Sequence, residues 1–290
     1  MTPGCPLPET RAESRKILFA LTISTVTPIT EFLTLSWLCI RSSAQGDLLL
    51  HDLSTSTTET VRQGAPSGLG KWVRQSVFVV LWMSTLFLGA GTLHWMRGWV
   101  FALVYCSSIA ILVLAVRHWN PDLMAARLKL RHKDTKPFDR IFLSIHLSLT
   151  GVMPGIAGLD TVRFHWSSMP AWIEAPAIIL FLMALTLIAW TMKENPWAEQ
   201  TVRIQLGRGH SVACSGPYRV VRHPMYVGAL AMYPAMAGML GSMLALAIAV
   251  LVMIAFVWRT AREDHALRTE LPGYETYAGA TKYRLVPGIW

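Results

Sequence analysis

Long apolar runs joined by very short links constrain this chain more than any other feature. Val73–Leu93 and Trp99–Val116 are two such runs, and the link between them contains little more than His94-Trp95-Met96-Arg97. A helix needs about 20 apolar residues to cross the hydrocarbon core of a bilayer. Only 15% of the residues are charged, whereas a soluble domain carries about 25%. The sequence therefore predicts an all-α, polytopic bundle of membrane helices, in which these two runs form an antiparallel pair.

Three more runs complete the predicted membrane bundle of about five spans over residues 17–192. Ile17–Ile40 can span a bilayer, although Pro28 and Glu31 interrupt it. Ile141–Leu159 and Ala171–Met192 are the other two. Residues 1–16 are polar and Pro-rich, which predicts a flexible N-terminus, and residues 41–70 indicate a loop. Two acids within the runs, Glu31 and Glu174, could line a substrate pocket or pair between helices, and pairing is favoured.

Residues 193–290 form the third predicted unit, which contains a helical hairpin. Tyr226–Met239 has only 14 residues, or roughly 21 Å of helix, which is too short for about 30 Å of hydrocarbon. Gly241 and Ser242 predict a turn, and Ser242–Trp258 returns as a second arm. We expect this hairpin to be tilted or seated against other helices, with a kink at Pro234 and a polar, helical, then irregular tail from 259 onward.

The positive charge is concentrated in two segments. Residues 117–140 contain seven Lys and Arg against three acids, and residues 200–290 contain nine against four, which accounts for the net charge of +9. Basic segments next to spans indicate the cytosolic side rather than a nucleic-acid surface. Within the first segment, Asn120–Arg127 predicts a capped amphipathic helix on the membrane surface. We expect a multi-pass membrane protein, in the endoplasmic reticulum of a eukaryote or the plasma membrane of a bacterium.

Two polar clusters bracket the hairpin. Gly216–Tyr226 contains two arginines, a histidine and two tyrosines, and Arg259–His265 contains two arginines, two acids and a histidine. Arginines bind carboxylates, acids bind an ammonium or sulfonium, and aromatic rings stack on a base. The alternative is that these residues only anchor span ends. The clusters predict a cytosolic site for a charged ligand with a flat ring. The four cysteines have no metal-binding spacing, so no metal is expected.

The two clusters also contain family motifs. Gly216-Pro217-Tyr218…Arg222-His223-Pro224-Met225-Tyr226-Val227-Gly228 and Arg262-Glu263-Asp264-His265 resemble the isoprenylcysteine carboxyl methyltransferase and phospholipid methyltransferase superfamily. The resemblance covers roughly residues 193–290. It implies S-adenosylmethionine as methyl donor, held between the loop before the hairpin and the tail. The family usually has two glutamates where this chain has Glu263 and Asp264, which is shorter by one methylene. With Gln205 from the same loop, the expected cofactor-binding residues are Gln205, His210, Gly216, Tyr218, His223, Pro224, Tyr226 and Glu263.

The acceptor is predicted to be lipophilic and to enter from the bilayer, while the donor enters from the cytosol. An isoprenylcysteine-type carboxylate is favoured, with Arg222 and Glu263 as the catalytic residues. A carboxylate is already ionised and needs no base, so Arg222 would orient it. A phenol, alcohol or amine, as in a phospholipid or another small lipophilic acceptor, would need Glu263 or His223 as base. Partners are therefore a lipophilic or prenylated substrate and membrane lipids, while the oligomeric state has no signal in the sequence.

Two other classes of protein share part of this pattern. A sterol-type membrane reductase using NADPH carries a similar Arg-His-x-x-Tyr element, but Gly-Asp normally follows there, and Val227-Gly228-Ala229 follows here. A transporter would show internal repeats with broken helices, and this sequence shows no such repeat. Both classes are therefore less favoured than a methyltransferase.

Overall fold

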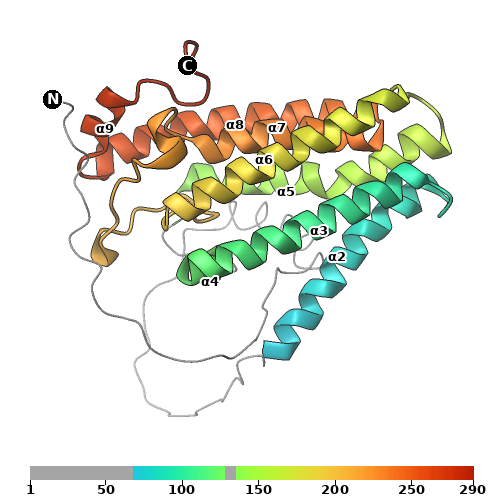
Figure 1. Ribbon diagram of the computed structural model, residues 1–290, viewed down its shortest axis with the longest axis horizontal. Helices are drawn as coiled ribbons and strands as arrows, with labels where there is room; N and C mark the ends of the chain where they lie inside the picture. Colours follow the sequence, from blue (N-terminus) through green and yellow to red (C-terminus); the bar gives the residue numbers. More distant parts are fainter. Residues whose placement is uncertain (1–67, 128–134) are drawn as a thin grey trace, which may run out of the picture. The chain divides into compact units, whose positions relative to one another are not determined.

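The computed structural model describes residues 68–127 and 135–290 (Figure 1). Contacts divide the chain into two compact units, of which one includes Met83–Trp290 and the other is Ala20–Trp82. The fold and the site described below belong to Met83–Trp290. The predictions for residues 1–16, the span Ile17–Ile40 with Glu31, and most of the loop 41–70 lie outside the described residues.

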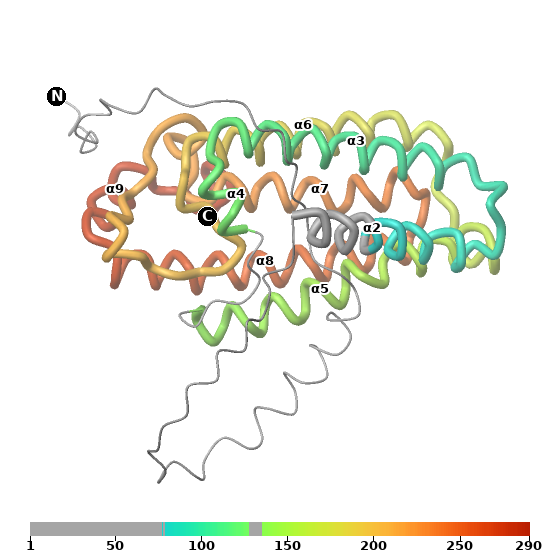
Figure 2. Tube along the Cα trace, turned by 90° about the horizontal axis from the view of Figure 1, so that it is seen from below, coloured from blue at the N-terminus to red at the C-terminus, as the bar shows by residue number. Residues whose placement is uncertain are grey.

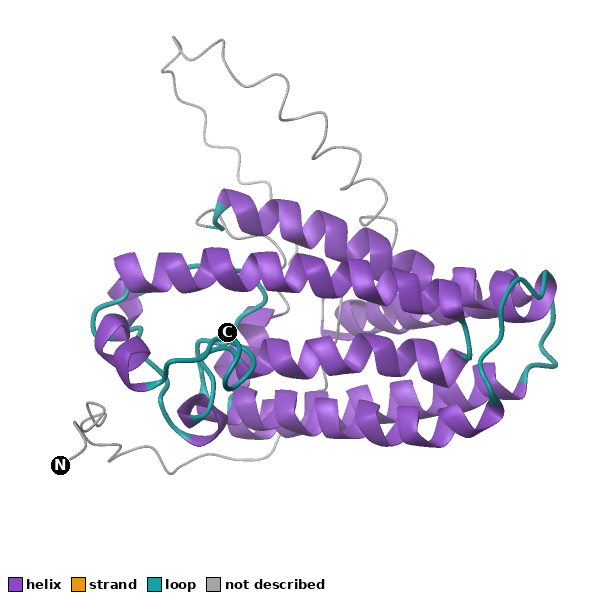
Figure 3. Ribbon diagram, turned by 90° about the horizontal axis from the view of Figure 1, so that it is seen from above, coloured by secondary structure: helices purple, strands orange, loops and turns teal. Residues whose placement is uncertain are grey.

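Within the described residues, all regular elements are helices, which are joined by loops, and there is no strand (Figure 3). This confirms the all-α class. Within residues 68–127 and 135–290, four helices are long and apolar enough to cross a membrane: Met96–Trp119, Pro137–Arg163, Ala171–Glu194 and Met243–Glu270. The helices are α2 Gly68–Ala90, α3 Met96–Trp119, α4 Pro121–Arg127, α5 Pro137–Gly158, α6 Glu174–Glu194, α7 Pro224–Leu240, α8 Met243–Glu270 and α9 Tyr274–Ala280.

Helix α7 is seated inside the bundle, as the sequence predicted. Its 17 residues span roughly 26 Å, less than the hydrocarbon core. It packs mainly between α6 and α8 (Figure 2), and most of its residues are buried. Two glycines let α6 approach closely, because a Cβ on Gly228 would lie 2.6 Å from Ile188 and one on Gly238 would lie 2.8 Å from Ala177. Helix α7 is therefore held by its neighbours rather than by lipid.

The turn between α7 and α8 is fixed by a buried carboxylate. Gly241 adopts φ +72°, and Ser242 caps α8 by accepting from the Ala245 amide at 2.9 Å. The fully buried Asp160 accepts from the Ser242 hydroxyl at 2.6 Å and from the Leu244 amide at 3.2 Å. The turn of the hairpin is thus held by uncharged hydrogen-bond donors that surround the carboxylate of Asp160.

Glu174 pairs between helices, as favoured from the sequence. One of its carboxylate oxygens lies 3.2 Å from Nε of Arg97, and Arg97 also donates to the Met169 carbonyl at 3.1 Å. The pair joins the starts of α3 and α6, so Glu174 has a structural role.

Two details differ from or add to the sequence prediction. The predicted arm Ser242–Trp258 and the predicted helical start of the tail form one helix, α8, which continues to Glu270, because Arg259 and Asp264 find buried partners of opposite charge at Asp139 and Arg222. The Asn120 side chain does not cap α4, since it donates to the carbonyls of Met192 and Lys193 at the end of α6.

Small residues also set the crossing of α2 and α5. A Cβ on Gly89 would lie 2.1 Å from the carbonyl oxygen of Gly155, whereas the nearest atom to a Cβ on Gly155 is the Thr85 carbonyl oxygen at 3.4 Å. The backbone of α2 therefore touches that of α5 at Gly89, and of these two facing glycines only Gly155 has room for a side chain.

We expect Gly89→Ala to destabilise the protein by about 1–3 kcal/mol, the usual cost of overpacking. Gly155→Ala is the matched control and is expected to change stability by less than about 1 kcal/mol, since its methyl group meets a near-ordinary contact. Thermal unfolding of both variants in detergent checks the difference, and equal effects would contradict this account of the crossing.

Candidate functional site

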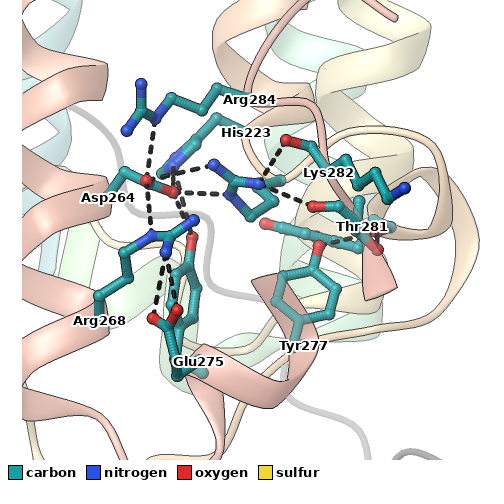
Figure 4. A network of polar contacts seen from close by, with 11 residues as sticks. His223, Asp264, Arg268, Glu275, Tyr277, Thr281, Lys282 and Arg284 are labelled. Carbon is teal, nitrogen blue, oxygen red and sulfur yellow. Dashed lines mark hydrogen bonds and ion pairs between the residues drawn. The ribbon is translucent and has the colours of Figure 1, made fainter. Parts of the chain in front are cut away.

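A buried ion pair joins the two polar clusters that the sequence singled out (Figure 4). Arg222 is 4% exposed and Asp264 is 0% exposed. Arg222 donates from Nε to Asp264 at 2.7 Å and from Nη2 at 3.2 Å. Its Nη1 donates to the carbonyls of Thr281 and Lys282, both at 2.7 Å. One guanidinium therefore ties together the loop before α7, the end of α8 and the segment after α9.

Asp264 is the centre of this network. Besides Arg222, it accepts from Arg268 at 3.2 Å, Arg284 at 2.9 Å and the Tyr274 hydroxyl at 3.1 Å, and Nε2 of His223 lies 3.3 Å away. The shorter acid at this position thus reaches all of these partners without the extra methylene of a glutamate. Charge-assisted bonds of this kind are stronger than neutral ones, so Asp264 holds the tail against the loop.

The network closes one side of a pocket between the loop that follows α6 and the C-terminal half of α8. The pocket is open to solvent, and about 740 Å³ of space not filled by atoms lies within it when the solvent at its mouth is included. Predicted site residues that line it are His210, Tyr218, Arg222, His223, Tyr226 and Glu263.

Three predicted cofactor residues do not line this pocket. Gln205 donates to Glu199 at 3.0 Å and accepts from Arg208 at 2.7 Å, so it braces the loop. Gly216 adopts φ +55°, and a Cβ there would lie 2.7 Å from the Glu194 side chain, which only a glycine avoids. Pro224 begins α7, where a missing N–H costs nothing. These positions shape the loop and its junction with α7.

Aromatic rings form the walls of the pocket. The rings of Trp197 and His210 stack with centroids 4.9 Å apart, while Tyr274 and Tyr277 meet edge to face at 5.5 Å. The Tyr277 hydroxyl donates to the Tyr218 carbonyl at 2.7 Å. Flat rings on both sides suit a planar heterocycle.

Sequence reasoning missed several residues of the pocket. Asn195, which donates to the Tyr218 hydroxyl at 2.8 Å, lies with Trp197 and Glu199 in the loop after α6. The sequence did offer one signal for these residues. Their loop is a polar segment that leads directly into the motif Gly216–Tyr226. Asp139, which does not line the pocket but contacts Arg259, had no such signal, because an acid in the first turn of a helix is common.

The floor of the pocket carries a cation and an anion. The Tyr226 hydroxyl donates to Glu263. Arg259, 5% exposed, lies 2.8 Å from Asp139 through Nε and donates from Nη2 to the Gln200 carbonyl at 2.7 Å. Its guanidinium also lies over the rings of Phe142, at 4.4 Å, and Tyr226, at 5.2 Å. Nη1 of Arg259 has no hydrogen-bond partner within residues 68–127 and 135–290.

Arg222 has different partners from those expected of a catalytic cation. Of its five N–H groups, four are used by Asp264 and by two tail carbonyls. Little of its donor capacity is left for a substrate. Arg259, which was not assigned a role from the sequence, is the pocket arginine with a nitrogen to spare.

Burial shifts the pKa values of several pocket groups outside the membrane spans. It raises the pKa of the Tyr218 hydroxyl above its ordinary value, so this group stays a neutral donor. Burial lowers the pKa of His210, although Glu199 and Glu263 oppose the shift. His210 is therefore neutral at pH 7, and its Nδ1 can accept from the Gln205 amide, which is 3.3 Å away.

Residues 172–270 match the model of the phospholipid methyltransferase family. The match runs from α6 to the end of α8 and includes both polar clusters. No curated protein matches the chain. The match confirms the resemblance to the integral membrane methyltransferases, the superfamily that includes isoprenylcysteine carboxyl methyltransferases. The protein is an integral membrane enzyme that transfers methyl groups, and the reductase and transporter alternatives lose support.

We expect Asp264→Asn to destabilise the protein by about 3 kcal/mol, because breaking a buried ion pair leaves arginines without a counter-charge. Asp264→Glu keeps the charge and serves as the control, with a smaller loss. Thermal unfolding and limited proteolysis of the tail are the measurements. A neutral variant as stable as the wild type would show that the network does not hold the tail.

Stability is expected to fall below about pH 6.5, the ordinary pKa of histidine, through His210. Its pKa is lowered in the folded state, so the unfolded chain binds the proton more readily and acid favours unfolding. His210→Gln removes this contribution. Melting temperatures of wild type and variant between pH 8 and pH 5 provide the check, and parallel curves would rule out the contribution.

Proposed function

We propose that this protein transfers a methyl group from S-adenosylmethionine to the carboxylate of a lipophilic acceptor of the isoprenylcysteine type. The observation that carries the proposal is the pair of opposite charges at the pocket floor. Arg259 keeps Nη1 without a partner among the described residues, while Glu263 accepts from Tyr226. A sulfonium donor needs a negative charge of the protein beside it, and a carboxylate acceptor needs a positive one. Because the two reactants meet, both charges must lie in the same pocket.

The residues of the pocket suit this donor. The stacked Trp197 and His210 offer a flat apolar face for the adenine. Glu263 offers a carboxylate to the cationic part of the donor, and Tyr218 and His223 offer polar groups beside it. The donor supplies an activated methyl group, and the protein aligns and desolvates the reactants. We assign Gln205, Gly216, Pro224 and Arg222 to the framework of this pocket.

Arg259 orients the acceptor. A carboxylate is ionised at pH 7 and attacks without a base, so the enzyme has to hold one oxygen in line and offset the loss of water around it. Arg259 is fixed by Asp139, by the Gln200 carbonyl and by two rings, which prepares Nη1 for this contact. The oxygen–carbon bond forms as the carbon–sulfur bond breaks, and the products are a methyl ester and a neutral thioether.

The acceptor reaches the site from the membrane. The pocket floor is formed by α7 and α8, and both helices continue into the apolar bundle. We place the site on the cytosolic face, next to the basic segments, in the endoplasmic reticulum if the source is eukaryotic. Membrane lipids then surround the acceptor while the soluble donor arrives from the other side.

A second candidate is methyl transfer to the amine of a phospholipid, which the name of the matching family model favours. An ammonium must lose a proton before it attacks, and Glu263 is then the nearest acid in the pocket. Purified enzyme with labelled donor, offered a farnesylated cysteine analogue or phosphatidylethanolamine vesicles, separates the two. Label in the lipid alone would favour the second candidate.

We expect Arg259→Gln to lower kcat/KM for the carboxylate acceptor about 100-fold, the scale of a misplaced reactant. Its affinity for S-adenosylhomocysteine, measured by calorimetry, is expected to change by less than about threefold, well under 1 kcal/mol. The matched control is Arg219→Gln, since Arg219 is an exposed arginine of the loop before α7. The proposal is falsified if the Arg259 variant remains fully active.

A further inference from the structure

Asp139 is a buried acid of the first half of the chain that lies against Arg259, a residue that lines the pocket. It lies in the first turn of α5 and is 0% exposed. It also lies outside residues 172–270, the segment that matches the family model. The match therefore assigns it no role.

The ordinary role of such an acid is to stabilise its own helix. An acid in the first turn interacts with the free N–H groups there. In Asp139, however, Oδ2 accepts from the amide of Val202 at 2.7 Å, and Oδ1 lies 2.8 Å from Nε of Arg259. Both oxygens face the loop and α8, so the helix start alone does not explain this residue.

The sequence of α8 makes this arrangement informative. Arg259 and Glu263 are four residues apart, a spacing at which opposite charges on a helix normally pair. In the described structure they form no ion pair with each other, because Arg259 pairs with Asp139 and Glu263 accepts from Tyr226. Two opposite charges on one face of α8 are thus kept apart by partners from other helices.

We infer that Asp139 is a positioning residue that holds Arg259 away from Glu263, so that Nη1 of Arg259 stays available to the acceptor and Glu263 to the donor. This inference rests on the proposed function for its kinetic consequence. The charge arrangement itself is independent of the identity of the acceptor.

Asp139→Asn tests the charge and preserves the shape. The amide oxygen still accepts from Val202, while the NH₂ group replaces the oxygen that faces Arg259. The guanidinium then lacks a counter-charge, and Glu263 is the acid one turn away on α8. Pairing between these two residues removes the cation from the acceptor and the anion from the sulfonium of the donor, a charge that S-adenosylhomocysteine lacks.

In kinetic assays with the farnesylated cysteine analogue, Asp139→Asn is expected to raise the acceptor KM and lower kcat, with kcat/KM down about 30-fold. Affinity for S-adenosylhomocysteine is expected to fall by less than about fivefold. Asp139→Glu retains the charge and is expected to show a smaller change in acceptor KM with unchanged S-adenosylhomocysteine affinity. Unchanged kinetics in the Asn variant, or an equal loss of both ligands, would overturn the inference.

Asp122→Asn is the matched control, because Asp122 is also in the first turn of a helix but is exposed. It is expected to behave as the wild type. Should Asp139→Asn fail to insert, Asp139→Glu decides on its own. A selective rise in acceptor KM supports the inference, and equal changes in both ligands, or none, count against it.

Melting temperatures give a test that needs no activity. Arg259→Gln, Glu263→Gln and the double variant are each made in two backgrounds, the wild type and Asp139→Asn. Their deviation from additivity is expected to be larger by about 2 °C or more in the Asp139→Asn background, where the two residues pair, than in the wild type. Additivity in both backgrounds sinks the inference. An enzyme that passes this test but methylates no carboxylate contradicts only the proposed function.

Discussion

The site depends on the buried ion pair between Arg222 and Asp264. A charge removed from water is costly unless it is paired and fully hydrogen-bonded, and this pair meets that condition only when the loop, α8 and the tail come together. The main chain follows the same path, since the amides of Arg222 and His223 donate to the carbonyls of Tyr283 and Arg284. The pocket is therefore a product of one electrostatic contact rather than of apolar packing alone.

The two ends of the last hairpin show different solutions to the burial of an acid. At the α7–α8 turn, Asp160 accepts from hydroxyl and amide groups. At the opposite end, Asp139 and Asp264 face arginines. Neutral donors fix a turn. The arginine partners of Asp139 and Asp264 also place charged groups beside an open pocket. The polar residues of the candidate site accordingly lie at that end of the hairpin.

The apolar helices could be read from the sequence because bilayer thickness sets their length. The polar motifs also pointed to the pocket, as the positions of Tyr218, His223, Tyr226 and Glu263 show. A helical start to the tail after Trp258 was predicted, but not that it continues α8 without a break to Glu270, since the partners that stabilise this part of the helix come from distant segments. For the same reason, the sequence did not reveal that Asp139 contacts Arg259 or that most N–H groups of Arg222 are already hydrogen-bonded, because both depend on which segments meet in space.

The length of α8 sets how far the proposed acceptor site lies from the end of that helix. Arg259 lies over the ring of Tyr226, two residues after the start of α7, and α8 continues eleven residues further to Glu270. That is about 16 Å of helix, roughly the reach of five extended residues. In the proposed arrangement, a carboxylate carried in the bilayer reaches Arg259 without passing along this length of α8, whereas the soluble donor has to enter past it.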